Sequence, residues 1–406
     1  MSDLKTTVSP NVELDPLSGS KVVSRFSSCV DGYSSVGSFL DGLDDVLIIM
    51  NDLKRSTPTK KVLMYLERYL ETVDVGQIDF SGLVATGSHS PPSDEEIRVI
   101  AGGMSGLSEK TLVHKARENE HIGVGVTSRG TSVKVDELIT GYDGVICINS
   151  VEPHYFAGYT GGRKSIVPGV SGWRTIEENH SHALSDRSMV LNLEDNPVHL
   201  DMVEGCKLVV DAVDSSFLGI NLVNFGKKIF DLQAGTIEGS FNAVLDTADK
   251  LYSIDMDREQ GFDVVVSEVT EPLNKNLYQS LKGFENGRGL CKTGGVLILV
   301  SECSEGVGPS EFYERMKFSD NPIEIIKDIE RDYTLGSHKT YNLLKFLENH
   351  EIFIVSDLPD KVVENCFCRP FPTLEKAYNY IRDSESADLD ILVIKESGNL
   401  VPKLNG

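Results

Sequence analysis

The sequence predicts an α/β protein: two α/β domains with largely parallel sheets and an active-site cleft between them. Three observations support this class. Short apolar runs without alternation are typical of strands buried on both faces of a parallel sheet. A polar or glycine-containing loop and an amphipathic helix follow such runs, and the alternation resumes beyond about residue 258. With 406 residues, 40% of them hydrophobic, the chain suffices for two cores, which we place at residues 1–257 and 258–406.

Composition narrows the classes of function. The formal net charge of −23 argues against binding to nucleic acid or to an anionic membrane. We see no stretch that is apolar enough to span a bilayer, and no apolar segment near residue 1 that would direct export. The seven cysteines are scattered, unlike a disulfide framework or a zinc site. We therefore expect a cytoplasmic enzyme with reduced thiols, without a nucleic-acid or membrane partner.

Three apolar runs predict parallel strands in the first domain, over residues 46–50, 83–86 and 144–148. Asp52 and Arg55 directly follow the first run, His89 follows the second, and the third runs toward His154. Open parallel sheets bind ligands outside the carboxyl ends of their strands, beside helix N-termini. We therefore expect Arg55, His89 and His154 to converge with Lys164 on one site.

Helix starts are marked by short local signals. Thr57 and Pro58 have the residue types of an N-cap and a first helical residue. The pairs Ser93–Glu96 and Thr175–Glu178 have the spacing of a capping box. We therefore expect helices to begin at these three places.

The stretch from 154 to 184 is rich in glycine and carries three histidines and one lysine. Gly161 and Gly162 belong to a loop, 158–165, whose glycines allow backbone N–H groups to approach a bound anion. In the helix that follows, His180 shares a face with Ile176, Ala183 and Leu184, whereas His182 points nearly the opposite way. We expect His180 to face inward.

The residues of this stretch leave three interpretations open. The first is a glycine-rich turn followed by a helix with a core histidine. The second is a phosphate-binding loop, since residues 158–165 come close to G-x-x-x-x-G-K-[ST]. However, only three residues separate Gly158 from Gly162, and Arg163 precedes the lysine. The third is a catalytic site assembled from the whole constellation.

The remaining elements complete the two domains. Residues 1–43 are weakly periodic, and we expect them to form edge structure on the first domain. The last elements of that domain are expected to be strands near 208–213 and 218–222 and a helix around 241–251. In the second domain a helix begins near residue 275, and Gln279 and Lys282 lie on its polar face, which periodicity alone would leave in solvent. The other expected elements are strands at 262–266, 296–300, 352–355 and 391–394, and helices near 323–330 and 339–349.

Six blocks of residues occur in the order and with the spacing of the lactate racemase family, which the chain resembles over nearly all residues beyond 43. The blocks are Asp52–Arg55, Ala85–His89, His154–Lys164, Pro168–Gly169, Asn179–His180 and Tyr278–Gly283. The resemblance implies that Lys164 carries a nickel-pincer nucleotide, pyridinium-3-thioamide-5-thiocarboxylic acid mononucleotide, and that His180 is a nickel ligand. It makes 1–257 the cofactor-binding domain, with further cofactor contacts from Asp52, Thr86, Gly87, Gly161 and Gly162.

The same resemblance implies the activity, a racemase or epimerase of 2-hydroxy acids. His89 and His154 would flank the substrate hydroxyl as alternating acid and base, and the C-terminal domain would contribute to substrate binding. The implied substrate-binding residues are Arg55, Gln279, Lys282 and His338. Because such an enzyme needs its cofactor to be built and inserted, the resemblance also implies cofactor-maturation enzymes as partners.

Three positions depart from the family's pattern. Lys54 stands where threonine is common, and Ser90 stands where arginine often follows the first catalytic histidine. His338 aligns with a substrate-facing tryptophan of lactate racemase, which puts lactate itself in doubt as the substrate.

The chemistry accounts for these residue types. The hydrogen on C2 of a 2-hydroxy acid is barely acidic, so we expect it to leave as hydride to the cofactor while a base takes the hydroxyl proton. The product is a bound 2-keto acid, and inversion needs one base on each face, a role that suits two histidines. Two other functions stay open: a phosphoryl transferase that uses the loop at 158–165, and a non-catalytic cofactor-binding protein.

Overall fold

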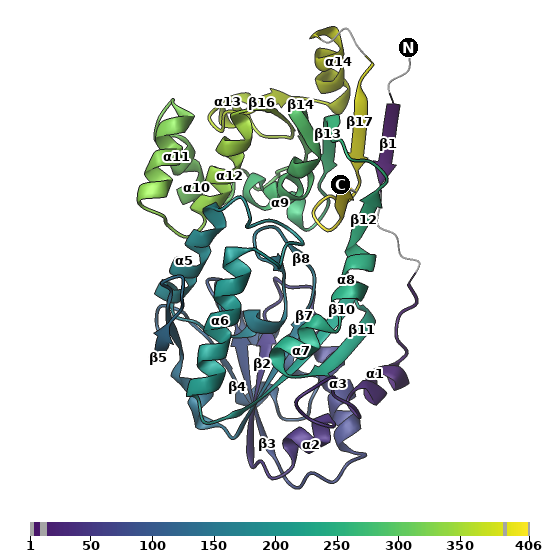
Figure 1. Cartoon of the computed structure of the whole chain (residues 1–406), viewed down its shortest axis with the longest axis vertical. Helices are drawn as coiled ribbons and strands as arrows, with labels where there is room; N and C mark the ends of the chain where they lie inside the picture. The colour runs from purple at the N-terminus through teal and green to yellow at the C-terminus, as the bar shows by residue number, and fades with distance from the viewer. Residues whose placement is uncertain (1–3, 9–13, 385–387, 405–406) are drawn as a thin grey trace. The chain divides into compact units, whose positions relative to one another are not determined.

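The computed structural model describes residues 4–8, 14–384 and 388–404, which form two compact units (Figure 1). The first unit runs to His182 and resumes from Asn192 to Asp249. The second unit holds the strand β1 (Leu4–Val8), the segment Ala183–Leu191 and the chain from Lys250. Each unit has its own sheet with mostly parallel strands. The predicted α/β class is therefore confirmed.

The first unit is built on a six-stranded sheet in the order β11-β10-β7-β2-β3-β4. Its neighbouring strands are parallel, apart from the antiparallel pair β10 and β11. Leu47 and Ile48 are consecutive on β2, so they point to opposite faces, and both are fully buried. This burial on both faces explains the continuous apolar run. The strands are β2 (Asp45–Asn51), β3 (Asp79–Ala85), β4 (Thr111–Val113), β7 (Gly144–Ser150), β10 (Ser216–Phe225) and β11 (Lys228–Gly235).

Helices and small hairpins surround this sheet. The apolar face of α3 (Thr59–Leu70) lies in the core, where Val62, Leu63 and Leu66 are fully buried. The helices are α1 (Gly19–Arg25), α2 (Val36–Leu40), α3 (Thr59–Leu70), α4 (Asp94–Ala101), α5 (Trp173–Ser181), α6 (Pro197–Ala212), α7 (Ile237–Asn242) and α8 (Leu245–Tyr252). The hairpin strands are β5 (His121–Val126), β6 (Ser132–Asp136), β8 (Pro153–His154) and β9 (Gly158–Tyr159), and short 3-10 helices are η1 (Ser108–Lys110), η2 (Glu137–Gly141), η3 (Gly162–Ser165) and η4 (His182–Leu184).

The second unit contains an all-parallel sheet in the order β1-β17-β13-β14-β15-β16. The helix expected near residue 275 is α9, which begins at Leu277, and its apolar residues Leu277, Leu281 and Phe284 are buried in one cluster. The strands are β12 (Ser253–Met256), β13 (Phe262–Glu268), β14 (Cys291–Val300), β15 (Glu351–Val355), β16 (Arg369–Phe371), β17 (Asp390–Ile394) and β18 (Val401–Leu404). The helices are η5 (Leu273–Lys275), α9 (Leu277–Gly287), η6 (Arg288–Leu290), α10 (Ser310–Met316), α11 (Pro322–Arg331), α12 (Ser337–Leu347), α13 (Asp360–Glu364) and α14 (Leu374–Ser384).

The N-terminal strand corrects one expectation. The whole of 1–43 was expected on the first domain, but β1 pairs in parallel with β17, and Val8 lies opposite Ile394. The compact units also change over at Lys250 rather than after residue 257, and the segment Ala183–Leu191 belongs with the second unit. A pairing across almost the whole chain leaves no trace in local residue patterns, so the sequence could not indicate it.

The strand expected at 208–213 is also wrong, because these residues end the long helix α6. Asn196 caps this helix through its side chain, which accepts hydrogen bonds from the backbone N–H groups of Val198 and His199, and Pro197 is the first helical residue. A short apolar run alone does not distinguish a buried strand from the buried face of a helix.

The helix starts give a mixed outcome. The capping box of Ser93 and Glu96 is present at the start of α4, as predicted. The helix α3 begins at Thr59, after Pro58, because the hydroxyl of Thr57 is hydrogen-bonded to Ser150 instead of capping the helix. The helix α5 begins at Trp173, two residues before Thr175, whose hydroxyl donates to a main-chain oxygen of β6. Tertiary hydrogen bonds override the local capping signal at both places.

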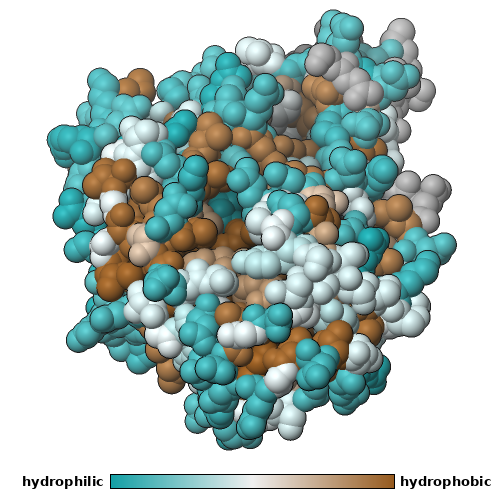
Figure 2. Space-filling model, turned by 60° about the horizontal axis from the view of Figure 1, so that its bottom comes forward, coloured by the Kyte–Doolittle hydropathy of each residue, from teal (hydrophilic) through white to brown (hydrophobic). Residues whose placement is uncertain are grey.

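Polar side chains predominate on the face shown in Figure 2, and hydrophobic side chains come to the surface in separate patches. The more exposed large hydrophobic residues include Val126, Phe318 and Ile323. The helices in the described part of the chain are all too short or too polar to cross a membrane.

Candidate active site

The carboxyl ends of β7, β2 and β3 lie at one edge of the first unit's sheet, since these strands are parallel neighbours. Asp52 and His89, which follow β2 and β3, meet there: Nδ1 of His89 lies 2.7 Å from Oδ2 of Asp52. The carboxylate is buried, whereas 36% of the histidine side chain is exposed. A carboxylate accepts the Nδ1 proton, which fixes the orientation of the ring and leaves Nε2 without that proton. The pair has the geometry of an oriented acid–base group.

The turn after β3 is tied to the glycine-rich segment. Gly87 has a positive φ of 53°, and its N–H donates to the carbonyl oxygen of Gly169 at 2.9 Å. The Thr86 hydroxyl donates to the carbonyl oxygen of His114 at 2.6 Å. Both residues were predicted to contact a cofactor. Their recorded bonds show a role inside the protein, and the cofactor contact stays a prediction.

The two glycines before η3 are required by close packing. Gly161 and Gly162 have positive φ angles of 87° and 52°. A Cβ at Gly161 would lie 2.6 Å from a methyl carbon of Val151, and one at Gly162 would lie 2.8 Å from the Cβ of Phe241. The Gly162 N–H donates to Oδ1 of Asn221 at 2.8 Å. This N–H group is therefore already satisfied, which disfavours the interpretation of the loop as a phosphate cradle.

Lys164 lies on η3 with its side chain buried. Burial lowers the pKa of its amine well below the usual value, and the positive charges of Arg55 and Arg163 lower it further. The nitrogen is 5.6 Å from the centre of the Phe156 ring. Desolvation and like charge both favour the neutral amine, which is the nucleophilic form of lysine.

Arg163 holds the segment that carries this lysine. Its buried guanidinium donates to the carbonyl oxygens of Ala157 and Tyr159, at 2.9 Å each, and to that of Gly161 at 3.3 Å. Burial lowers the pKa of Arg163 to about 9. Three carbonyl dipoles, rather than a carboxylate, therefore offset part of the cost of burying this charge.

Phe156 brings two predicted histidines close to the lysine. Its ring centre lies 4.6 Å from that of His154 and 5.0 Å from that of His180. Both histidines are buried, and 7% and 8% of their surface is exposed. His154, His180 and Lys164 therefore surround one aromatic side chain, although they come from β8, α5 and η3.

A buried carboxylate on α6 anchors the helix that carries His180. Asp201 accepts a hydrogen bond from the amide of Asn179, at 2.8 Å, and bonds from the hydroxyls of Thr127 and Thr131. His182, with 23% of its side chain exposed, places Nε2 3.8 Å from the same carboxylate. His180 is therefore the more buried of the two histidines, as the helix phase predicted.

In the second unit, Gln279 and Lys282 lie on α9, which Asn276 caps by accepting a bond from the Gln279 N–H. Lys339, in the first turn of α12, donates to the carbonyl oxygen of Tyr278 and lies over its ring. Burial lowers the pKa of Lys339 to about 7, Glu285 opposes this shift, and Lys282 adds to it. The two lysines are thus close enough to repel each other.

His338, which precedes Lys339 on α12, is also buried. Its Nδ1 lies 2.8 Å from the hydroxyl of Tyr333. Burial, with a smaller contribution from the Lys339 charge, lowers the pKa of His338 to about 3, so the imidazole is neutral at physiological pH. It is a polar, uncharged group.

Metal ligation from the protein alone is not supported. Within the described ranges, no group of three or more His, Cys, Asp or Glu side chains is arranged to hold a metal ion. The seven cysteines are free thiols and lie outside the predicted site. A metal held at His180 would therefore take its other ligands from a bound group.

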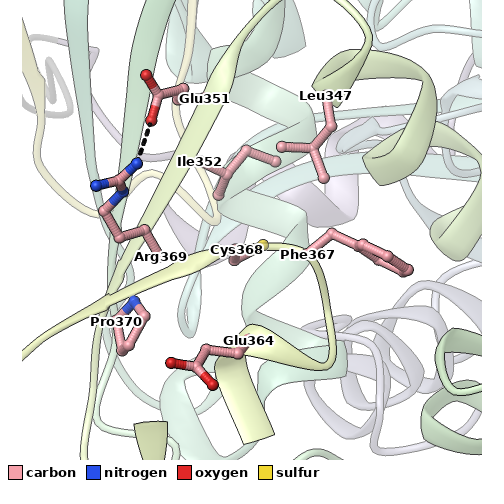
Figure 3. A pocket seen from close by; sticks show the side chains of 8 residues that line it. All are labelled: Leu347, Glu351, Ile352, Glu364, Phe367, Cys368, Arg369 and Pro370. Atoms are coloured by element: carbon pink, nitrogen blue, oxygen red, sulfur yellow. Dashed lines mark hydrogen bonds and ion pairs between the residues drawn. The ribbon is translucent and has the colours of Figure 1, made fainter. Parts of the chain in front are cut away.

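Two surface cavities lie away from the predicted residues. One, of about 280 Å³, lies between β15 and β16 in the second unit, where the Glu351 carboxylate pairs with Arg369 at 3.3 Å (Figure 3). The other, of about 540 Å³, lies beside β4 and η2 in the first unit. The predicted site residues line neither cavity.

Sequence reasoning missed several residues that hold this site. Phe156 and Arg163 fall inside a block that the resemblance had marked, so their position was a usable signal. Asp201 and the buried pair of His114 and Asp136, whose Nδ1 and Oδ2 atoms lie 2.7 Å apart, are distant in sequence from every motif. Nothing local to these residues distinguishes them from surface residues.

The fold and these groups define an α/β enzyme with acid–base and cationic groups at its strand ends. Residues 21–191 match the model of the lactate racemase N-terminal domain, and residues 257–401 match that of the lactate racemase C-terminal domain. The chain therefore belongs to the lactate racemase family, and it is an isomerase of the racemase class.

Curated relatives and solved structures agree with this placement. The chain is 28% identical over 395 residues to a lactate racemase of Thermoanaerobacterium thermosaccharolyticum, covering 95% of this chain and 91% of the relative. It is 27% identical over 364 residues to a lactate racemase of Lactiplantibacillus plantarum, covering 86% of this chain and 84% of that relative. The fold is similar to that of the T. thermosaccharolyticum lactate racemase apoprotein, with a TM-score of 0.84 and 24% identity over 99% of this chain and 94% of that chain. It is also similar to that of a Thermotoga maritima protein, with a TM-score of 0.71 and 16% identity over 97% of this chain and 100% of that chain.

We predict that Asp201→Ala lowers the free energy of unfolding by about 3 kcal/mol, because it leaves the buried donors of Asn179, Thr127 and Thr131 without their acceptor. Chemical denaturation of the full chain measures this. Asp211→Ala, an exposed position near the end of the same helix, is the matched control and should change the unfolding midpoint little. Overlapping unfolding curves for the two variants would contradict the anchoring role of Asp201.

Proposed function

We propose that the protein is a racemase or epimerase that inverts C2 of a small 2-hydroxy acid, and that it carries a nickel-pincer nucleotide on Lys164. When bound, this group supplies nickel and accepts hydride reversibly from C2, so that the substrate passes through a bound 2-keto acid. The observation that carries the proposal is the buried amine of Lys164, whose surroundings lower its pKa, beside the aromatic ring that also contacts His154 and His180.

The residues fit the proposed cofactor. Thioamide attachment needs an unprotonated amine, and the surroundings of Lys164 favour that form. Nickel accepts imidazole readily, and pincer sulfur and carbon atoms would complete a ligand set to which the protein contributes His180. Asn149 supports the fit as well, because its buried side-chain Nδ2 has no hydrogen-bond partner among the described residues, while its Oδ1 accepts a bond from Ser165, next to Lys164. A bound polar group could satisfy that donor.

Two bases serve the two faces of the substrate. Asp52 holds the Nδ1 proton of His89, so Nε2 of His89 takes the hydroxyl proton on one face. His154 has this role on the other face. Asp52 was expected to contact the cofactor; its hydrogen bond supports a different role, in which it acts through His89.

Cationic groups receive the substrate carboxylate. Arg55 is close enough to lower the pKa of Lys164, so a cation is present near the reacting groups of the first unit. We assign carboxylate and hydroxyl binding to Arg55, Gln279 and Lys282. Local positive charge is needed because a small anion must approach a chain with a net charge of −23.

The two other functions receive less support. A phosphoryl transferase would need backbone N–H groups free to hold phosphate, but the Gly162 N–H is bonded to Asn221. A cofactor carrier would need no oriented acid–base pair, whereas Asp52 orients His89. The names of the relatives, both lactate racemases, also favour racemisation. The expected partners are a small 2-hydroxy acid and the enzymes that mature the cofactor.

The test of the proposal is the mass of the intact protein made together with the cofactor pathway. Wild type should carry a covalent adduct of the nucleotide mass and racemise 2-hydroxy acids. Lys164→Ala should lack both, since the loop contains no second lysine. Lys207→Ala, an exposed lysine on α6, is the control and should keep the adduct. An unchanged adduct in Lys164→Ala would refute the attachment site.

Metal content tests the proposed ligand. His180→Ala should lose bound nickel, while His182→Ala should keep it, because the ring of His180 contacts the aromatic ring beside Lys164, whereas Nε2 of His182 faces the carboxylate of Asp201. Elemental analysis of adduct-bearing protein measures the nickel content. Equal loss of nickel in both variants would mean that the ligand is assigned to the wrong histidine.

The base assignments predict graded effects on turnover. His89→Ala and His154→Ala should each lower kcat for racemisation by about 10²–10⁴-fold, since inversion needs a proton acceptor on both faces. Asp52→Asn should cost less, because an amide oxygen still accepts the Nδ1 proton of His89 while the charge is lost. Racemisation is followed by chiral chromatography. Near wild-type turnover in either alanine variant would rule out the two-base scheme.

Substrate choice is expected to follow His338. A neutral imidazole is smaller than the tryptophan of lactate racemase and can hydrogen-bond, so it should favour a longer or more polar C3 substituent than methyl. One such hydrogen bond, of about 1 kcal/mol, gives about a fivefold preference. We therefore predict that malate or an aldonic acid has a higher kcat/KM than lactate in a panel of single-enantiomer 2-hydroxy acids. His338→Trp should shift the preference toward lactate. If lactate has the highest kcat/KM of the panel with the wild-type enzyme, this role of His338 is contradicted.

A further inference from the structure

A second histidine–aspartate pair lies in the first unit, outside the groups to which a function is assigned above. His114 follows the edge strand β4 and is fully buried. Its Nδ1 lies 2.7 Å from Oδ2 of Asp136, and its Nε2 lies 3.0 Å from the carbonyl oxygen of Ser171. Neither ring nitrogen is available to a substrate, so this histidine is not an acid–base catalyst.

The geometry indicates the protonation state of the pair. A carbonyl oxygen only accepts hydrogen bonds, and an ionised carboxylate does the same, so both ring nitrogens must donate. Asp136 is ionised: although burial raises its pKa, hydrogen bonds from His114, the Leu138 N–H and Asn119 outweigh this and lower the pKa overall. His114 is therefore a buried imidazolium that uses both of its N–H groups.

One of these bonds reaches the coil that follows Lys164. The hydroxyl of Ser171 donates to the carbonyl oxygen of Ile166 at 2.8 Å, and the Gly169 N–H donates to that of Lys164 at 3.0 Å. The Nε2 bond from His114 to Ser171 thus fixes a coil that folds back on the lysine. The helix α5, with His180, begins two residues after Ser171.

The main chain of His114 reaches the turn after β3. Its carbonyl oxygen accepts a hydrogen bond from the Thr86 hydroxyl at 2.6 Å, and its N–H donates to the carbonyl oxygen of Val84 at 3.0 Å. The Gly87 N–H of the same turn donates to Gly169, in the coil after Lys164. His114 therefore connects the turn that leads to His89 with the segment that carries Lys164.

We propose that His114 is a positioning residue of the racemase, whose charged ring holds the coil after Lys164 against the turn after β3. It acts through Ser171 and Thr86 and touches neither substrate nor cofactor. Its effect on turnover rests on the proposed function, whereas its effect on the structure of the two segments does not.

The groups that face the pair are consistent with one retained positive charge. The ring of His121, on β5, lies edge-on to that of His114 with their centres 5.7 Å apart. Burial lowers the pKa of His121, the charge of His114 and that of Lys134 lower it further, and Asp136 opposes them. His121 is therefore the neutral member of the histidine pair, and Asp136 is the counterion of His114.

Two substitutions separate the two ring bonds of His114. In His114→Gln the amide nitrogen takes the place of Nε2 and can still donate to Ser171. In His114→Asn the amide nitrogen takes the place of Nδ1, so the bond to Asp136 is kept and the bond to Ser171 is lost. His121→Gln, which removes the neighbouring ring, is the control.

Hydrogen–deuterium exchange on full-length apoprotein is the first measurement. His114→Asn should speed exchange in peptides covering 84–89 and 164–171, while His114→Gln and His121→Gln should match wild type there. In the loaded enzyme His114→Asn should lower kcat about 10- to 100-fold, as is typical when an outer support of a site is removed, and His114→Gln should restore most of it. Equal exchange in all variants, or equal loss of kcat in the Asn and Gln variants, would overturn the proposal.

Imidazole ¹⁵N spectra of the wild-type apoprotein supply a readout that needs no variant to fold. At pH 7 both ring nitrogens of His114 should carry protons, whereas His121 should show one protonated and one bare nitrogen. A bare ring nitrogen on His114 would overturn the proposal. Because the spectra and the exchange use apoprotein, they stand even if Lys164 carries no adduct, so a failure of the proposed function is distinguishable from a failure of this inference.

Discussion

The burial of two adjacent basic side chains, Arg163 and Lys164, is the constraint on which the site depends. Removing a charge from water costs several kcal/mol even after the protein relaxes. Arg163 offsets this cost with three main-chain carbonyl oxygens that converge on its guanidinium. For Lys164, burial and the charges of Arg55 and Arg163 lower the pKa of its amine, which favours the uncharged form. One residue therefore organises the loop, and the surroundings of its neighbour favour an unprotonated amine.

This arrangement explains why the segment is rich in glycine. Three carbonyl groups can point at one guanidinium only if the chain turns sharply, and Gly158 and Gly161 take positive φ angles within that turn. The same turn packs so closely that a Cβ at Gly161 would overlap Val151. The glycines therefore serve the burial of Arg163, whereas in the sequence they resemble the glycines of a phosphate-binding loop.

The parts of the fold that sequence predicts well are those with local causes. The run at 46–50 has one physical explanation, burial on both faces of a sheet, and β2 has that environment. The box of Ser93 and Glu96 is equally local and is present. The strand β1 could not be predicted, because its partner β17 lies almost 390 residues away in the chain. Thr175 failed as a helix start because its hydroxyl is bonded to β6 across the fold.

In the site, too, the features with local causes can be predicted from the sequence, and those that depend on distant segments cannot. That Asp52 and His89 lie together follows from strand order, since β2 and β3 are parallel neighbours. The hydrogen bond that His89 donates to Asp52 does not follow, because it depends on how the loops after the two strands are placed relative to each other. The link between His114 and Ser171 needs β4, β6 and α5 to be placed at once. Motifs thus mark the reacting groups, and only the folded chain shows what orients them.

The orienting groups share one property that bears on how the site works. Arg163 and His114 are basic, buried and bonded to main-chain carbonyl oxygens of the segment 157–171, and Lys339 is bonded in the same way to α9 in the second unit. A bond to the main chain is insensitive to which side chains occupy the segment. The side chains of each segment can therefore vary while the backbone that carries them stays in place. Because the bonds are withdrawn from solvent, they are also stronger than bonds exposed to water. The position of the backbone and the identity of the side chains on it are in this way separable properties of the fold.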